Sequence, residues 1–450
     1  MAFRPVYILI LAFTILVDYT TAILIENSQG RRRKLLLLVS IFANVGVLAF
    51  FKYYNFLNES FRELVNVFGL ALPVPPMLDI ILPIGLSFHV FQSLSYTIEV
   101  YRGQCRAERH LGILALYVMF YPQIVAGPIE RPQHLLPQFR EKHFFNYERV
   151  VSGLQLMLWG FFKKVVVADR LAPLVNATYN DPHSYRGISF IVATVFFAFQ
   201  LYCDFSGYSD IARGSAQVMG FKLVRNFDRP FRSETISDFW KRWHVSLSSW
   251  FRDYLLFSLR GNRIKWRFYF NLFLTFLVSG LWHGAKWTYV VWGAVNGCYL
   301  VLGGVWRESI RGSRPSLSSL SWLRRLMQTA RMLRTFSLFC FTLIFFRANS
   351  LADAGYIVAH LFDGLGTLKL DNQFIQMFVM LRAGKLDFAV TLLALILLLT
   401  VEGLQSRHYL GEMLARQLVW VRWSLYYACI IVIFISAILN EPQRFIYFQF

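Results

Sequence analysis

His283 is the side chain in this sequence that best suits acid–base chemistry. It stands between Trp282 and Gly284 at the end of a long apolar run, and no other histidine or charged residue occurs between Arg267 and Lys286. Histidine is the one side chain that in its ordinary state takes and returns a proton near pH 7. An apolar channel would keep the imidazole neutral, which is the form that a general base requires. On its chemistry alone, His283 is either a functional residue or a packed one.

A second histidine, His244, lies in a segment rich in basic and aromatic residues, 226–263. Apolar residues recur there at helical spacing between 236 and 255, which predicts one helix. Thr235, three residues before Asp238, resembles a capping box at the start of that helix. The opposite face is charged, so we expect the helix to lie in the membrane interface instead of crossing the bilayer. An isolated histidine at such a place is more often structural than catalytic, and both interpretations of His244 stay open.

A third polar region, 199–213, interrupts an apolar run. Four of its residues are spaced 4, 3 and 4 apart and so share one helical face: Tyr202, Ser206, Ser209 and Arg213. Asp204 and Asp210 flank that face. These carboxylates need partners, because an unpaired charge at mid-bilayer costs roughly 2.5–3.5 kcal/mol on insertion scales. The region is either a clamp between helices or the polar wall of a substrate tunnel.

On the tunnel interpretation, seven residues from these three regions are candidates for lining a path to the histidines. They are Asp204, Ser206, Asp210, Trp240, Lys241, Arg242 and Trp282.

Long apolar stretches must hold these residues in place. Hydrophobic residues make up 56% of the 450 residues and charged residues only 16%, whereas a soluble globule typically carries about 25% charge. Since a membrane-crossing helix needs about 20 apolar residues, we predict an all-α polytopic membrane protein. About eleven spans are expected, at roughly 6–25, 35–57, 78–100, 111–127, 150–168, 188–220, 268–285, 287–306, 335–348, 387–403 and 422–439.

The spans are expected to form one integral membrane domain over 1–450, with peripheral N-terminal spans (1–82), a core that contains the histidines (83–306) and C-terminal spans (307–450). Basic residues in short loops favour the cytoplasm. Arg31–Lys34 and the later group Arg102, Arg106 and Arg109 alternate with a weakly basic loop, 58–77. This alternation places the N-terminus outside, and an odd span count places the C-terminus in the cytoplasm. We also expect a basic cytoplasmic loop at 305–334 and an interfacial segment at 351–386.

Several other functions are disfavoured. The five cysteines are isolated and form no C-x-x-C, so they are expected to be buried apolar residues and no metal site is predicted. The net charge of +20 comes mostly from basic residues between apolar runs, which is typical of contact with anionic lipid headgroups and not with nucleic acid. The sequence has neither a G-x-S-x-G elbow nor a P-loop, and no bound cofactor is expected.

Five strings along the chain resemble the membrane-bound O-acyltransferase family. They are FYPQIVAGPIERPQHLLPQF (120–139), YCDFSGYSDIARG (202–214), NFDRPFRSETISDFWKRWHVSLSSWFRDYL (226–255), GLWHGAKWTYVVWGAVNG (280–297) and FIYFQF (445–450). They are similar to the branch that holds the membrane subunits of bacterial alginate O-acetylation, peptidoglycan O-acetylation and teichoic-acid D-alanylation. The likeness is collinear from about residue 83 onward.

This resemblance implies a fold and a site. The fold would be a ring of spanning helices with re-entrant helices around a central tunnel, in which a cytoplasmic and an extracellular funnel meet. His283 would be the catalytic histidine and His244 a second histidine of these bacterial members. Several relatives have a histidine where this chain has Asn296, so Asn296 receives no catalytic role.

The resemblance also implies an activity. An acyl group, with acetyl expected, would pass from a cytoplasmic thioester such as acetyl-coenzyme A to hydroxyls of an extracytoplasmic polysaccharide. His283 would act as the general base. An extracytoplasmic acyltransferase-like or esterase-like partner protein would complete the transfer, and the location would be the bacterial cytoplasmic (inner) membrane. A D-alanyl transferase for teichoic acid, fed by a carrier protein, is the alternative within this class. A membrane transporter or flippase is the alternative of another class.

Overall fold

The structure is a computed structural model that describes residues 5–81, 83, 85–124, 127–309, 321–364, 385–404, 417–439, 443, 445 and 446. Throughout these residues the regular structure is helical, with no strand. The first half contains α1 (Ile8–Glu26), α2 (Gly30–Leu48), α3 (Tyr54–Val67), α4 (Leu86–Arg102), α5 (Leu111–Met119), α6 (Tyr121–Ile124), α7 (Pro132–Leu135), α8 (Tyr147–Phe161), α9 (Asp169–Asn180) and α10 (Ile188–Met219). The second half contains α11 (Ile236–Arg242), α12 (Val245–Trp250), α13 (Lys265–His283), α14 (Trp287–Ser309), α15 (Ser321–Arg347), α16 (Leu351–Ala359), α18 (Lys385–Leu404) and α20 (Val419–Leu439).

Three of these helical runs contain wider π-helical turns, at Ala49–Tyr53, Phe162–Ala168 and Phe251–Leu255. Such turns interrupt the regular α-helical hydrogen bonding and are frequent at functional sites. The first joins α2 to α3, the second joins α8 to α9, and the third follows α12.

Seven helices of the described chain are long and apolar enough to cross a membrane: Ile8–Glu26, Gly30–Val67, Tyr147–Asn180, Ile188–Met219, Trp287–Ser309, Trp322–Arg347 and Val419–Ile438. They correspond to seven of the eleven predicted spans, so a polytopic membrane protein is confirmed. The other four predicted spans form shorter or less apolar helices: α4, the α5–α6 pair, α13 and α18.

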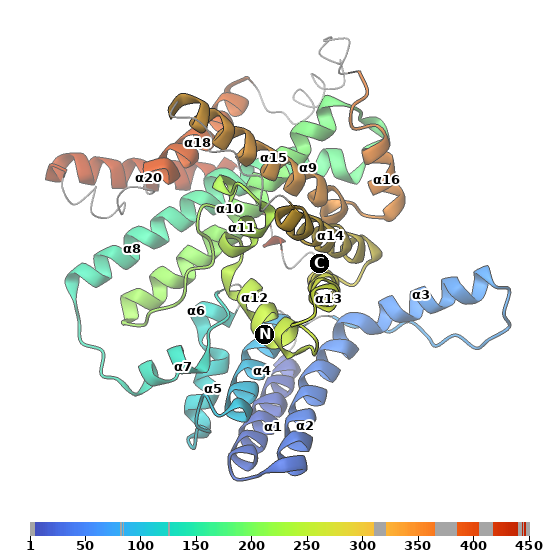
Figure 1. Ribbon diagram of the computed structural model, residues 1–450. Helices are drawn as coiled ribbons and strands as arrows, with labels where there is room; N and C mark the ends of the chain where they lie inside the picture. Colours follow the sequence, from blue (N-terminus) through green and yellow to red (C-terminus); the bar gives the residue numbers. More distant parts are fainter. Residues whose placement is uncertain are drawn as a thin grey trace.

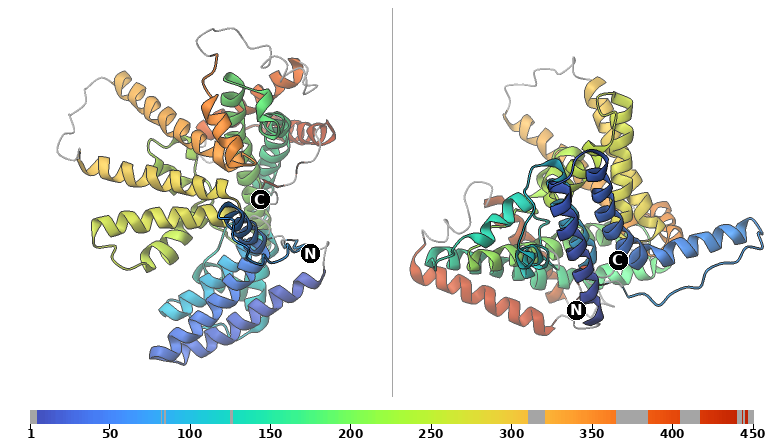
Figure 2. Two further views of the ribbon diagram at one scale, coloured as in Figure 1. Left: turned by 90° about the vertical axis from the view of Figure 1, so that its right-hand side faces the viewer. Right: turned by 90° about the horizontal axis from the view of Figure 1, so that it is seen from below.

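Short helices occupy the middle of the molecule and long helices surround them (Figure 1). α1, α2, α4 and α5 pack together at one side, and α8 and α10 run along another. α9, α15 and α16 lie opposite the first group, while α11 and α12 lie between the groups beside α13 (Figure 1). Figure 2 shows the pair α13 and α14 side by side and separated from the α1–α2 bundle. The two histidines therefore lie where short and long helices meet.

Glycines set the closest helix contacts. A Cβ atom added at Gly160 would lie 2.7 Å from the carbonyl oxygen of Gly207, so α8 and α10 touch backbone to backbone. One added at Gly280 would lie 2.3 Å from the carbonyl oxygen of Tyr289, and one at Gly293 would lie 2.5 Å from that of Phe276. Small residues let membrane helices approach in this way. These contacts fix the position of α13, which carries His283, relative to α14.

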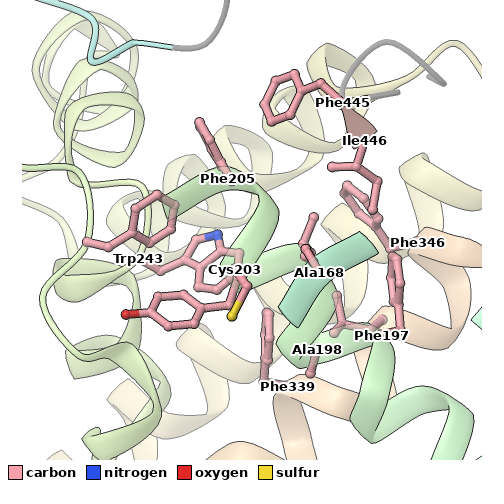
Figure 3. Packing of buried hydrophobic residues seen from close by; sticks show 14 of the residues in the cluster. Ala168, Phe197, Ala198, Cys203, Phe205, Trp243, Phe339, Phe346, Phe445 and Ile446 are labelled. Carbon is pink, nitrogen blue, oxygen red and sulfur yellow. The ribbon is translucent and has the colours of Figure 1, made fainter. Parts of the chain in front are cut away.

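The core between the groups is largely aromatic. Figure 3 shows Phe205, Trp243 and Phe339 gathered in this core, with Phe445 and Ile446 from the end of the chain also buried there. The ring centroids of Phe205 and Phe445 lie 5.8 Å apart. The last described residues thus pack on α10, at the level of the polar region 199–213.

Two sequence expectations are wrong in their local structure. The expected single helix over 236–255 is broken at Trp243–His244 into α11 and α12 and continues in the π-helical turn Phe251–Leu255. The expected loop 305–334 is helical wherever it is described, because α14 continues to Ser309 and α15 begins at Ser321. The short predicted span 335–348 is the second half of α15. Residues 310–320, and 365–384 of the expected interfacial segment 351–386, lie outside the described residues, as does most of the string 445–450.

Candidate active site

His283 is the last residue of α13, and aromatic rings surround its imidazole. The ring centroids of Trp292, Trp282 and Phe346 lie 4.9, 5.0 and 5.4 Å from that of His283. Only 5% of the residue is exposed. Packing against three rings fixes the orientation of a side chain that could otherwise rotate.

Gly284 leaves room for the chain to turn back after α13. A Cβ atom there would lie 2.1 Å from the ring of Tyr289, which is closer than atoms can approach. The chain leaves α13 in an extended conformation at Gly284 and enters α14 three residues later. The tripeptide Trp282-His283-Gly284 thus combines an aromatic wall, the imidazole and the space for a tight reversal.

His244 occupies the break between α11 and α12 in a left-handed conformation, with φ of 44°. Such a conformation is strained for a residue with a side chain and recurs at functional sites. Asn226 holds the break: its carbonyl oxygen accepts from the Val245 N–H at 2.9 Å, and its side-chain oxygen accepts from the Ser246 hydroxyl at 2.7 Å. The Thr235 hydroxyl caps the start of α11 by accepting from the Asp238 N–H at 3.1 Å, as predicted.

Both histidines line one cavity of about 570 Å³, between α11, α12 and the following turns on one side and α13 and α14 on the other. Its inner wall is mostly aromatic and aliphatic. Three exposed basic residues line its outer part: Lys241, Arg252 and Arg307. One exposed acidic residue, Glu308, also lines it and pairs with Lys265 at 3.0 Å. Since His244 and His283 are 1% and 5% exposed, the cavity leads from a basic entrance to two buried imidazoles.

The structure brings together only some of the predicted lining residues. Trp240 and Lys241 line the cavity with the two histidines. Trp282 does not line it; its ring stacks on Phe91 with centroids 5.2 Å apart. Arg242 does not line it either, because its guanidinium pairs with Asp238 at 3.0 Å.

Asp204 lies away from the cavity, between helices. Lys164 Nζ lies 2.7 Å from carboxylate oxygens of both Asp204 and Asp169, and the Ile446 N–H donates to Asp204 at 2.8 Å. All of these groups are largely buried. This arrangement favours the interhelical clamp over the tunnel wall.

Ser206 and Asp210 form the neighbouring clamp. Lys163 donates to the Ser206 hydroxyl at 3.0 Å and pairs with Asp210, which also lies 3.4 Å from Arg213, the predicted i,i+3 partner. Lys163 and Lys164 are consecutive, and the π-helical turn Phe162–Ala168 directs both toward α10. The two clamps therefore tie α8 and α9 to α10.

The sequence analysis did not single out four basic residues that bind the helix end at His283, pair with the buried carboxylates or line the cavity: Lys52, Lys163, Lys164 and Arg307. The first three are charged residues inside apolar runs, so the criterion that selected Asp204 and Asp210 would also have selected them. Arg307 could not be found in this way, because it lay in an expected loop. Among the described residues, no group of three or more His, Cys, Asp or Glu side chains could hold a metal ion.

Comparison with known proteins agrees with the resemblance. Residues 111–346 match the family model of MBOAT, the membrane-bound O-acyltransferase family. The chain belongs to this family. The matched segment of this membrane-bound O-acyltransferase contains both histidines and all three residues at the basic entrance.

Curated relatives carry related names. The protein named "Probable alginate O-acetylase" of Pseudomonas aeruginosa is 37% identical over 359 residues, covering 80% of this chain and 66% of that protein. The peptidoglycan O-acetyltransferase of Helicobacter pylori is 32% identical, covering 77% of this chain and 68% of that protein. The teichoic acid D-alanyltransferase of Streptococcus thermophilus is 29% identical, covering 50% and 57%. The chain spans less than two thirds of the length of the alginate relatives, for example 58% of the one from Azotobacter vinelandii.

Proposed function

We propose that this membrane-bound O-acyltransferase moves an acetyl group from a cytoplasmic thioester donor, acetyl-coenzyme A, to hydroxyls of an extracytoplasmic polysaccharide. One observation carries the proposal: His283 and His244 line a single cavity whose exposed charged residues are three basic ones and one acidic one, Glu308. The names of relatives that match most of this chain support acetyl as the transferred group.

The shape and charge of the cavity suit such a donor. Lys241, Arg252 and Arg307 at the entrance attract the phosphates of coenzyme A by simple electrostatics. The apolar inner wall suits the uncharged thioester end, which would then reach His283. We place the entrance on the cytoplasmic side, the N-terminus outside and the protein in the bacterial cytoplasmic membrane, following the distribution of basic residues.

In the reaction we propose, His283 takes the proton from an acceptor hydroxyl, and the hydroxyl oxygen forms a bond to the acetyl carbonyl carbon. The carbon–sulfur bond then breaks, and the protonated His283 returns its proton to the leaving thiolate. His244 orients the donor or relays a proton from its fixed position in the helix break. An extracytoplasmic acyltransferase-like or esterase-like partner completes the delivery to the polysaccharide.

Two rival functions lead to different measurements. A teichoic-acid D-alanyl transferase would consume D-alanyl carrier protein and leave acetyl-coenzyme A untouched, and the relative from Streptococcus thermophilus carries that name. A flippase would move lipid without consuming any thioester. Isotopically labelled acetate fed to cells, followed by mass spectrometry of envelope glycans, separates these functions.

The decisive variant is His283→Ala. Losing a positioned acid–base group typically costs about 10²–10⁴-fold in rate, so we expect acetylation of the polysaccharide to fall at least about 100-fold, with normal amounts of protein in the membrane. The matched control is His183→Ala, which makes the same change at an exposed histidine between α9 and α16. Normal acetylation by His283→Ala would refute the proposed role of His283.

A further inference from the structure

The C-terminal end of α13 receives hydrogen bonds from an element far away in the sequence. Lys52 Nζ donates to the carbonyl oxygens of Trp282 at 2.6 Å and His283 at 3.2 Å. The neighbouring Tyr53 hydroxyl donates to the carbonyl oxygen of Leu281 at 2.7 Å. Three successive carbonyls that end at His283 are thus held by two successive side chains.

These carbonyls need such partners. The last four carbonyls of a helix have no partner within the helix, and a cation at this end is also favoured by the helix dipole. Hydrogen bonds from a charged donor are roughly twice as strong as neutral ones. The contact from Lys52 is therefore stronger than an ordinary cap.

Lys52 places a charge inside an apolar run, which costs free energy in a membrane protein. It is the only charged residue of the apolar run 35–57, and a charge inside a membrane helix is rare and usually functional. Among the ion pairs found in the described part of the chain, none involves Lys52. Its observed partners are the carbonyls of α13 and the face of the Trp282 ring, 5.9 Å from the ammonium.

The backbone around Lys52 is adapted to this contact. Lys52 and Tyr53 belong to the π-helical turn Ala49–Tyr53 between α2 and α3. A π-helical turn has more residues per turn than an α-helix. Consecutive side chains therefore point in more similar directions than they do in an α-helix. Both residues can therefore reach the same helix end.

The helical run α2–α3, which contains Lys52, also contacts the start of α14, on the other side of the turn after His283. Trp287, the first residue of α14, donates its indole N–H to the Ser60 hydroxyl at 3.2 Å, and its ring lies 5.5 Å from that of Phe56. The reversal from His283 to Trp287 is thus bracketed by α2–α3. Residues 1–82, expected to be peripheral, reach the catalytic segment, although Lys52 precedes the segment 111–346 that matches the family.

We propose that Lys52, assisted by Tyr53, is a positioning residue that fixes the backbone of His283 so that its imidazole points into the cavity. The aromatic rings around His283 fix its side-chain rotation, while Lys52 fixes the helix end from which the side chain departs. The inference rests on the proposed function of His283 as the base.

The test compares Lys52→Met with Lys52→Arg in protein reconstituted into vesicles, with acetyl-coenzyme A as the probe. Three quantities are measured: the number of donor-binding sites per protein, the KM for the donor, and the rate of acetyl consumption, by transfer or hydrolysis, per binding site. Because a misplacement of about 1 Å can cost roughly 100-fold in rate, we expect Lys52→Met to lower the rate per site about 10- to 100-fold. The number of sites and the KM for the donor should stay within about threefold. Lys52→Arg, which can still donate to carbonyls, should recover most of the rate.

Matched variants separate positioning from stability. Lys34→Met makes the same change at an exposed lysine of α2 and should leave the rate per site unchanged. Tyr53→Phe removes only the bond to Leu281 and should cause a smaller loss than Lys52→Met. A loss of binding sites in proportion to the loss of rate in Lys52→Met would mean a purely structural role and would overturn the inference.

The inference and the proposed function fail separately. If Lys52→Met turns over at the wild-type rate while His283→Ala is inactive, the inference is wrong and the function of His283 stands. If His283→Ala remains active, the proposed function is wrong whatever Lys52→Met does.

Discussion

Lys164, Asp169 and Asp204 form a buried ion triad between α9, α10 and the turn that joins α8 to α9. Substitutions in this triad test how much it contributes to the stability of the fold. Lys164 lies 2.7 Å from both Asp169 and Asp204. Lys164→Met leaves two buried carboxylates without their cation, and breaking a buried pair in this way costs about 3–5 kcal/mol. Asp204→Asn leaves Lys164 paired with Asp169 and keeps a polar acceptor for the Ile446 N–H, so it costs about 1–3 kcal/mol. Lys164→Met is therefore expected to lower the free energy of unfolding more than Asp204→Asn does.

The assay is the temperature at which half of the purified protein loses its monodisperse gel-filtration peak in detergent. Turnover of acetyl-coenzyme A per folded protein is measured in parallel. We expect the midpoint to fall clearly further for Lys164→Met than for Asp204→Asn. The protein that remains folded in Asp204→Asn should keep its turnover within about twofold, since Asp204 lies away from the cavity.

Two results would refute this reasoning. Equal midpoints for the two variants would mean that Lys164 does not compensate two carboxylates. An unchanged midpoint with abolished turnover in Asp204→Asn would show that Asp204 belongs to the tunnel wall and not to a clamp.

Two further predictions concern charges outside the spanning helices. Lys241→Glu should raise the KM for acetyl-coenzyme A several-fold, and added salt should weaken the effect because it screens exposed charges; the same change at the exposed Lys222, outside the cavity, should do neither. The hydrogen bond to the buried Glu130 carboxylate raises the pKa of His134 above its usual value. Its stabilising contribution should thus be complete below about pH 6.5, the ordinary value for histidine, and decline as the pH rises through the raised pKa. The difference in thermal midpoint between wild type and His134→Gln should accordingly shrink between pH 6 and pH 9, and a constant or growing difference would contradict this assignment.

The sequence predicted the helical, membrane-spanning character well, because hydrophobic run length is a local property. Gly293 and Gly297 form a G-x-x-x-G pattern, which is typical of close helix contact, and the structure places Gly293 against the carbonyl oxygen of Phe276 in α13 and Gly297 against Phe273. The break at His244 could not be predicted in this way. The apolar spacing of 236–255 continues through it, and the break is held by Asn226, which lies outside that pattern.

What the sequence determined by itself is the presence of long apolar helices and the position of the candidate imidazole, His283, at the end of one of them. Each follows from interactions between neighbours along the chain. Only the tertiary structure decided that Asp204 and Asp210 serve as clamps, that Arg307 joins the basic entrance, and that Lys52 holds the end of α13. These roles depend on which helices pack together, since a buried charge acquires its role from a partner that can be more than 200 residues away.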